Sequence, residues 1–118
     1  WSKHVDMVWV EDQEWFVKDT INHYYNHLNI DTYYDPISFM EVVHQYPLDT
    51  RIVLDTYYEM PDKTPYTTDG FDLAKELHAM GYTKLILFAG EDPGARAPEY
   101  LTVVLKSDRE KKQILDKI

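Results

Sequence analysis

The sequence has 118 residues, no cysteine and a formal net charge of −9 at pH 7. This length suffices for one domain with a hydrophobic core, and the absence of cysteine excludes disulfides and thiolate metal sites. The negative charge argues against direct binding to nucleic acid, which needs Lys and Arg to neutralise phosphates. A second reading is that the charge only keeps the domain dissolved.

No apolar run approaches the roughly 20 residues of a membrane helix, and no signal-peptide pattern is present. We therefore expect one domain spanning residues 1–118, located in the cytoplasm and without a membrane partner. Because the chain begins at Trp1 rather than at methionine, we also expect it to be cut from a longer protein.

Strand-like and helix-like segments alternate from one end of the chain to the other. Val5–Val10 is the first predicted strand, and Ile30–Tyr34 is the second. Between them, apolar residues recur at spacings of three and four, which predicts a helix. Its expected inner face consists of Val17, Ile21, Tyr24 and Leu28.

The pair Asp35-Pro36 predicts the start of a second helix, with Asp as the N-cap and Pro in the first turn. The expected inner face of this helix consists of Ile37, Met40 and Val43. Arg51–Asp55 follows as a third strand, and its nearly continuous apolar character indicates burial on both faces.

The pair Asp69-Gly70 predicts the start of a third helix that ends at Gly81. Its expected inner face consists of Phe71, Ala74 and Leu77. Lys84–Ala89 is the fourth predicted strand. The Pro- and Gly-containing segment after it leaves room only for a short or broken fourth helix.

Leu101–Lys106 is the fifth predicted strand, and a closing helix capped by Ser107 or Asp108 follows it. The expected buried face of that helix consists of Ile114, Leu115 and Ile118. Strands that alternate with helices indicate a parallel sheet with helices on both faces and right-handed crossovers. Such sheets bind ligands beyond the carboxyl ends of their strands, where the strand order reverses.

Ionisable residues follow three of the predicted strands: Glu11-Asp12, Asp55 and Lys106. In the strand order 2-1-3-4-5 the first and third strands are neighbours, so the carboxylates converge. Two carboxylates 4 Å apart repel by about 1 kcal/mol in water and about 4 kcal/mol at an effective dielectric constant near 20. A hard divalent cation relieves this repulsion, and Lys106 can neutralise a phosphate oxygen. The arrangement suits phosphoryl transfer, with Asp55 able to act as the nucleophile.

With these residues in this order, the chain resembles the receiver domain of two-component response regulators and hybrid sensor histidine kinases. The resemblance covers nearly the whole chain and also rests on Met60-Pro61 and Asp69-Gly70. It implies an α/β, flavodoxin-like, doubly wound five-stranded parallel sheet of order 2-1-3-4-5. A shortened or irregular fourth helix is expected in this member.

The resemblance implies that Asp55 accepts a phosphoryl group from a histidine kinase or a histidine phosphotransfer domain in a phosphorelay. It further implies Mg²⁺ (or Mn²⁺) held by Asp12, Asp55 and the backbone carbonyl of Tyr57, with Glu11 acting mainly through water. Lys106 would pair with the phosphoryl group. The implied chemistry is metal-dependent self-phosphorylation and autodephosphorylation rather than that of a conventional enzyme.

The sequence departs from the family pattern at several positions. Phe88, or Ala89 if the register shifts by one, replaces the hydroxyl residue that usually ends the fourth strand. Val103 replaces the usual aromatic residue three positions before Lys106, and Ser107 replaces the usual proline. Without the hydroxyl, we expect phosphoryl binding to weaken about ten- to a hundredfold. These losses predict atypical output switching.

The segment Tyr57–Asp69 is longer than in the family, because Asp69 lies 14 residues after Asp55. One interpretation is a lid or docking loop above the acidic site, since long loops in compact domains are usually functional or disordered. The other is a tolerated surface insertion, since added loop length costs little entropy.

Other functions are also compatible with parts of the sequence. A pseudo-receiver would bind a partner without being phosphorylated. A haloacid dehalogenase-like phosphatase would need an aspartate two residues after its nucleophile, where this chain has Tyr57. His23 and His27, with Asp19 one turn earlier, have a spacing that could hold a metal, but we expect an exposed pair without one.

Overall fold

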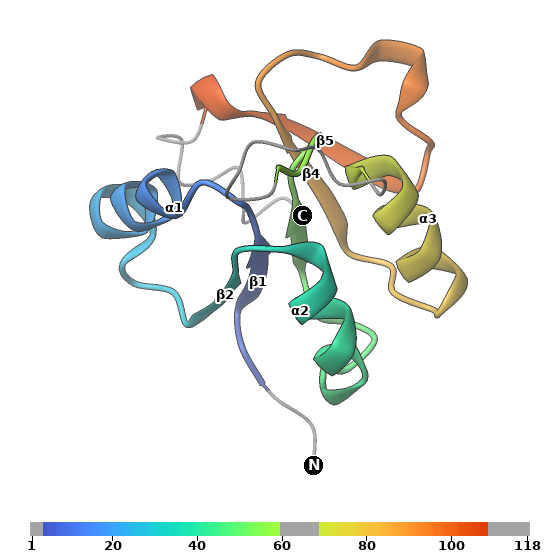
Figure 1. Cartoon of the computed structure of the whole chain (residues 1–118), viewed down its shortest axis with the longest axis horizontal. Helices are drawn as coiled ribbons and strands as arrows, with labels where there is room; N and C mark the ends of the chain where they lie inside the picture. Colours follow the sequence, from blue (N-terminus) through green and yellow to red (C-terminus); the bar gives the residue numbers. More distant parts are fainter. Residues whose placement is uncertain (1–3, 60–68, 109–118) are drawn as a thin grey trace.

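The computed structural model describes residues 4–59 and 69–108. In these ranges all strands are parallel and form one sheet of order β2-β1-β3-β4-β5 (Figure 1). The strands are β1 (Met7–Val10), β2 (Ile30–Tyr33), β3 (Ile52–Leu54), β4 (Leu85–Ala89) and β5 (Leu101–Leu105). The predicted α/β class and flavodoxin-like strand order are confirmed.

The α-helices of the described residues are α1 (Glu14–Thr20), α2 (Pro36–Val42) and α3 (Gly70–Ala79). Shorter helical turns are η1 (Ile21–Tyr25), η2 (Val43–Gln45), η3 (Gly94–Arg96) and η4 (Lys106–Asp108). In this part of the chain, no helix has the length and apolar character needed to span a bilayer.

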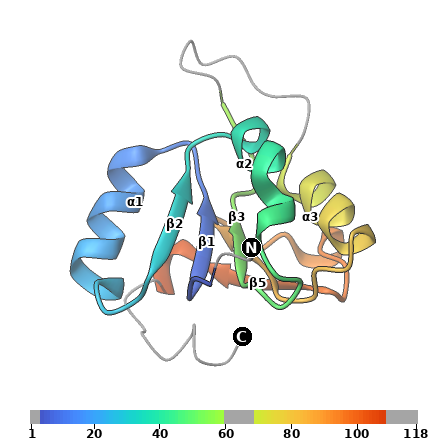
Figure 2. The ribbon, with the colours of Figure 1, turned by 90° about the horizontal axis from the view of Figure 1, so that it is seen from below.

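Helix α1 covers one face of the sheet, and α2 and α3 cover the other (Figures 1 and 2). Successive residues of β1 show this division, because Val8 and Val10 pack in the cluster beneath α2 and α3, whereas Met7 and Trp9 pack in the cluster beneath α1. All residues of β1, β3 and β4 are buried. Burial on both faces explains why these strands are apolar without alternation.

The predicted inner face of the first helix is only partly correct. Val17 is buried, but Ile21, Tyr24 and Leu28 are half-buried. The helix changes to π geometry at η1. This wider turn rotates the following side chains relative to an α-helix, so that Tyr25 rather than Tyr24 is buried.

Helix α2 begins as predicted, since the Oδ1 atom of Asp35 accepts a hydrogen bond from the backbone N–H of Ser38 at 2.7 Å. The prediction that Ile37 faces inward is wrong, because Ile37 is 56% exposed. The buried stripe passes through Pro36 and Phe39 to Val43, at spacings of three and four. Ile37 directly follows Pro36 and therefore lies about 100° around the helix from the start of this stripe.

Helix α3 also begins where predicted, with a capping box between Asp69 and Asp72. Gly81, at φ 105°, ends it in the left-handed conformation that favours glycine. Ala74 and Leu77 are buried as expected, whereas Phe71 is half-buried.

Between β4 and β5 the only helical segment among the described residues is η3, which agrees with the predicted short fourth helix. Strand β5 ends at Leu105, and Lys106 begins the turn η4. The expected buried residues of the closing helix, Ile114, Leu115 and Ile118, lie outside the described residues, as do Met60-Pro61 and most of the insertion.

Candidate functional site

The carboxyl ends of β1 and β3 bring Glu11 and Asp55 side by side. Val10 is in register with Leu54, so the next residues of the two strands are Glu11 and Asp55. Glu11 is 0% exposed and Asp55 is 9% exposed. Carboxylate oxygens of Glu11, Asp12 and Asp55 lie within 4.8 Å of one another. We refer to these three residues as the acidic triad.

Lys106 reaches the acidic triad from the far side of β4. Its Nζ atom lies 2.8 Å from Oε1 of Glu11 and 3.2 Å from Oδ1 of Asp55, and 4.9 Å from the ring centroid of Phe16. Burial lowers the pKa of Lys106, but the two carboxylates outweigh this effect and raise the pKa above its ordinary value. Lys106 therefore stays positively charged beside Asp55.

Lys106 compensates the charge of the acidic triad only in part. Burial, and then the neighbouring Asp55, raise the pKa of Glu11 to about 10, although Lys106 opposes the shift. Oε2 of Glu11 and Oδ1 of Asp12 are buried and have no hydrogen-bond partner among the described residues. Each such buried acceptor costs about 1–3 kcal/mol. A divalent cation with oxygen ligands would satisfy both atoms, so the residues fit Mg²⁺.

Tyr58 holds the backbone around Asp55 in place. Its hydroxyl is buried, donates to the carbonyl of Val10 at 3.0 Å and accepts from the N–H of Asp55 at 2.9 Å. Burial raises the pKa of Tyr58 well above its ordinary value, so the hydroxyl stays protonated. In the sequence, Tyr58 belongs to the predicted insertion. The presence of an aromatic residue after a strand does not indicate that its hydroxyl forms these two hydrogen bonds.

Gly70 brings the start of α3 against the backbone of Asp55. The N–H of Gly70 donates to the carbonyl of Thr56 at 2.9 Å. A Cβ atom on Gly70 would lie 1.9 Å from the carbonyl oxygen of Asp55. The pair Asp69-Gly70 thus starts a helix, as the sequence predicted, and also permits a close approach that only glycine allows.

Phe88 lies beside Asp55, since Leu54 is in register with Leu87 on β4. Its ring is buried, and the centroid of the ring lies 5.5 Å from that of Trp9 and 6.2 Å from that of Phe16. Ala89 belongs to the cluster beneath α2 and α3. An aromatic core residue therefore occupies the position at which the resemblance to receiver domains led us to expect a hydroxyl.

Val103, at the second position that the resemblance assigns to a switch residue, is half-buried and in register with Leu87. It packs against the cluster beneath α2 and α3. Its branched aliphatic side chain offers no hydroxyl and no ring at this position.

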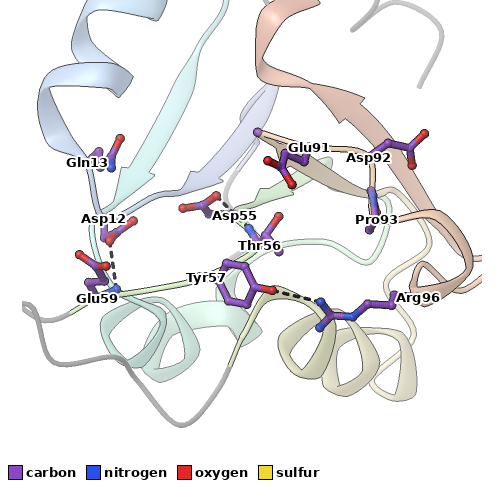
Figure 3. Close-up of a pocket in the computed structure, with 11 residues that line it drawn as sticks. Asp12, Gln13, Asp55, Thr56, Tyr57, Glu59, Glu91, Asp92, Pro93 and Arg96 are labelled. Atoms are coloured by element: carbon purple, nitrogen blue, oxygen red, sulfur yellow. Dashed lines mark hydrogen bonds between the residues drawn. The ribbon is translucent and has the colours of Figure 1, made fainter.

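A pocket of about 470 Å³ opens next to the acidic triad. Figure 3 shows Asp12 and Glu59 at one end of it, and the Tyr57 ring directed toward Arg96 at the other. The N–H of Glu59 donates to Oδ2 of Asp12 at 3.0 Å, and Arg96 donates to the Tyr57 hydroxyl at 3.0 Å. Arg96 could not be predicted as a pocket residue, because its position depends on the path of η3.

The histidine pair is not part of this site. His23 pairs with Asp19 through an Nδ1–Oδ1 distance of 3.2 Å on the exposed side of the first helix. His27 is exposed as well. Among the described residues, the acidic triad is the only group of His, Asp or Glu side chains arranged to hold a metal ion.

No protein-family model, curated protein or solved structure matches this chain. Its function is therefore argued from the fold and from the contacts of the site.

Proposed function

We propose that this chain is a phosphorelay receiver domain in which Asp55 accepts a phosphoryl group from a histidine kinase or a histidine phosphotransfer domain. The observation that supports this proposal most strongly is the acidic triad at the β1 and β3 ends, with Lys106 3.2 Å from Asp55. Its two buried acceptor oxygens without a partner call for a cation at the same place.

Asp12 and Asp55 would hold Mg²⁺ (or Mn²⁺) together with the backbone carbonyl of Tyr57, with Glu11 acting mainly through water. The bound cation would neutralise the charge of the phosphoryl oxygens. Lys106 adds a second positive charge that is already in place before the phosphoryl group arrives.

The transfer step uses a carboxylate oxygen of Asp55. Oδ1 accepts from the N–H of Thr56 at 2.8 Å and contacts Lys106, so we assign Oδ2 as the nucleophile. Oδ2 attacks the phosphorus of a phosphohistidine, a P–O bond forms, and the imidazole nitrogen leaves with the electron pair of the broken P–N bond. Later attack by water on phosphorus breaks the P–O bond and releases inorganic phosphate.

Binding of beryllofluoride, a phosphoryl mimic, tests the acceptor role. In the presence of Mg²⁺ we expect ¹⁹F NMR to show a bound beryllofluoride signal for the unmutated chain and none for Asp55→Asn, which lacks the anionic oxygen that the mimic requires. Asp49→Asn is the matched control, because Asp49 is exposed and lines a pocket at the opposite edge of the sheet. Equal binding by Asp55→Asn and Asp49→Asn would refute the assignment.

The affinity for Mg²⁺ is expected to rise with pH. The pKa of Glu11 is raised from 4.5 to about 10, so across the neutral range the folded domain keeps a proton on Glu11 that opposes the cation. Displacing one proton tightens apparent binding by up to about tenfold per pH unit below that pKa. Calorimetric Mg²⁺ titrations at several pH values measure the slope. The slope should vanish in Glu11→Gln, and a pH-independent affinity of the unmutated chain would contradict the prediction.

The alternative is a pseudo-receiver that binds a partner without phosphorylation. Phe88 and Val103 favour it, because neither can serve in the usual hydroxyl–aromatic switch. This alternative predicts that the unmutated chain binds neither Mg²⁺ nor beryllofluoride, so the experiment above separates the two functions.

A further inference from the structure

Arg96 joins three separate segments at the pocket. Its Nη1 atom donates to the hydroxyl of Tyr57 at 3.0 Å, and its Nη2 atom lies 3.9 Å from Oδ2 of Asp69. The guanidinium carbon lies 4.6 Å from the ring centroid of Phe71. Arg96 thus connects the loop after β4 to the residue two positions beyond Asp55 and to the start of α3.

These contacts are weak enough to exchange. The Arg96 side chain is 57% exposed, and its separation from Asp69 lies at the limit of an ion pair. Exposed ion pairs and cation–π contacts contribute little because water competes for the charge. A phosphoryl group offers the guanidinium two charged acceptors in a matching bidentate geometry, which is a stronger interaction than one neutral phenol.

The distribution of charge in the pocket also points to Arg96. Among the described residues that line it, Arg96 is the only cation, and five of these residues are carboxylates. These are Asp12, Asp55, Glu59, Glu91 and Asp92. Lys106 is not among the lining residues, and it is held by Glu11 and Asp55. Because Asp55 and Arg96 line the same pocket, a phosphoryl group on Asp55 would extend into a space that Arg96 borders and that Lys106 does not line.

We propose that Arg96 binds the phosphoryl group on Asp55, in place of the hydroxyl that Phe88 cannot supply. This inference rests on the proposed acceptor function and adds a residue to it. On binding, Arg96 leaves the Tyr57 hydroxyl and Asp69. Phosphorylation would thereby break the contacts between the loop after β4 and the start of α3. This change could transmit the signal without an aromatic residue at position 103.

Beryllofluoride affinity in Arg96 variants tests this role. With Mg²⁺ saturating, we expect Arg96→Gln to weaken beryllofluoride binding about ten- to a hundredfold, the value of a charge-assisted hydrogen bond. Arg96→Lys, which keeps the charge but loses the bidentate fork, should fall in between. Lys75→Gln is the matched control, because it removes one exposed positive charge from α3. Affinity for Mg²⁺ alone should not change in any of these variants.

Tyr57→Phe distinguishes direct phosphoryl contact from structural support. It frees Arg96 from its phenol partner, so direct contact predicts equal or tighter beryllofluoride binding. If Arg96 only braced the loop through Tyr57, the same variant would bind more weakly. If the beryllofluoride affinity of Arg96→Gln stays within about twofold of that of the unmutated chain, the inference about Arg96 is overturned. The proposed acceptor function of Asp55 would remain intact in that case. Absence of any bound signal in the unmutated chain would overturn both.

Discussion

Replacing Gly70 with alanine is expected to destabilise the domain by about 3 kcal/mol and to abolish beryllofluoride binding. The added Cβ would lie 1.9 Å from the carbonyl oxygen of Asp55 and 2.9 Å from Cδ1 of Leu87. Overpacking usually costs about 1–3 kcal/mol, and here the obstacle is a backbone atom that cannot rotate away. The better helix propensity of alanine returns only about 1 kcal/mol. The clash therefore dominates and displaces the backbone of Asp55, the proposed phosphoacceptor.

Urea unfolding of Gly70→Ala and Gly90→Ala provides the comparison. Gly90 lines the pocket beside Asp55, but a Cβ there meets no atom within 4 Å. Gly90→Ala should therefore stay within about 0.5 kcal/mol of the unmutated chain, as surface substitutions usually do. If Gly70→Ala were equally harmless, the close approach of α3 to Asp55 would be wrong.

The helix starts could be predicted because their signals are local, whereas the strand order was predicted from the resemblance to receiver domains. The pairs Asp35-Pro36 and Asp69-Gly70 cap helices through contacts within four residues, and both predictions are confirmed. The prediction that Ile37 faces inward is wrong because a short helix with few apolar residues can have more than one inner face. Only packing against the sheet decides which face is buried. The π turn at η1 had no visible signal in the sequence, and it changed which tyrosine is buried.

The convergence of the acidic triad followed from topology. In a parallel sheet, residues that follow neighbouring strands meet at one edge, so Glu11 and Asp55 could be brought together without knowing any side-chain contact. The complete burial of Glu11 and its 2.8 Å contact with Lys106 could not be predicted. Both depend on how α1 and Phe16 cover that edge of the sheet.

Tyr58 and Arg96 could not be predicted as site residues from the sequence. Both make contacts through loops, and the path of a loop is set by tertiary packing rather than by local propensity. Phe88 and Val103 replace the residues that usually form the switch in receiver domains. The sequence therefore predicted an acceptor site without the residues that normally respond to phosphorylation. The structure instead presents Arg96 at the pocket and Tyr58 behind Asp55, at positions that the family pattern does not mark.

Tyr58→Phe is expected to lower the free energy of unfolding by about 2–6 kcal/mol. Removing the hydroxyl leaves the carbonyl of Val10 and the N–H of Asp55 buried without a partner. Each unsatisfied group costs about 1–3 kcal/mol, while phenylalanine preserves the packing of the ring. The loss should be visible as a lower urea midpoint with an unchanged m value, because the surface exposed on unfolding is the same.

The same variant separates positioning from stability. Tyr82→Phe is the matched control, since its buried hydroxyl donates to the carbonyls of Val43 and Tyr46, away from the site. Both variants should lose stability, but only Tyr58→Phe should weaken beryllofluoride binding, by about ten- to a hundredfold for an Asp55 carboxylate displaced by about 1 Å. If the two variants bound beryllofluoride equally well at a temperature where both are folded, Tyr58 would support the fold alone. A selective loss would instead show that the hydrogen bonds of the Tyr58 hydroxyl to β1 and to the Asp55 backbone set the position of Asp55.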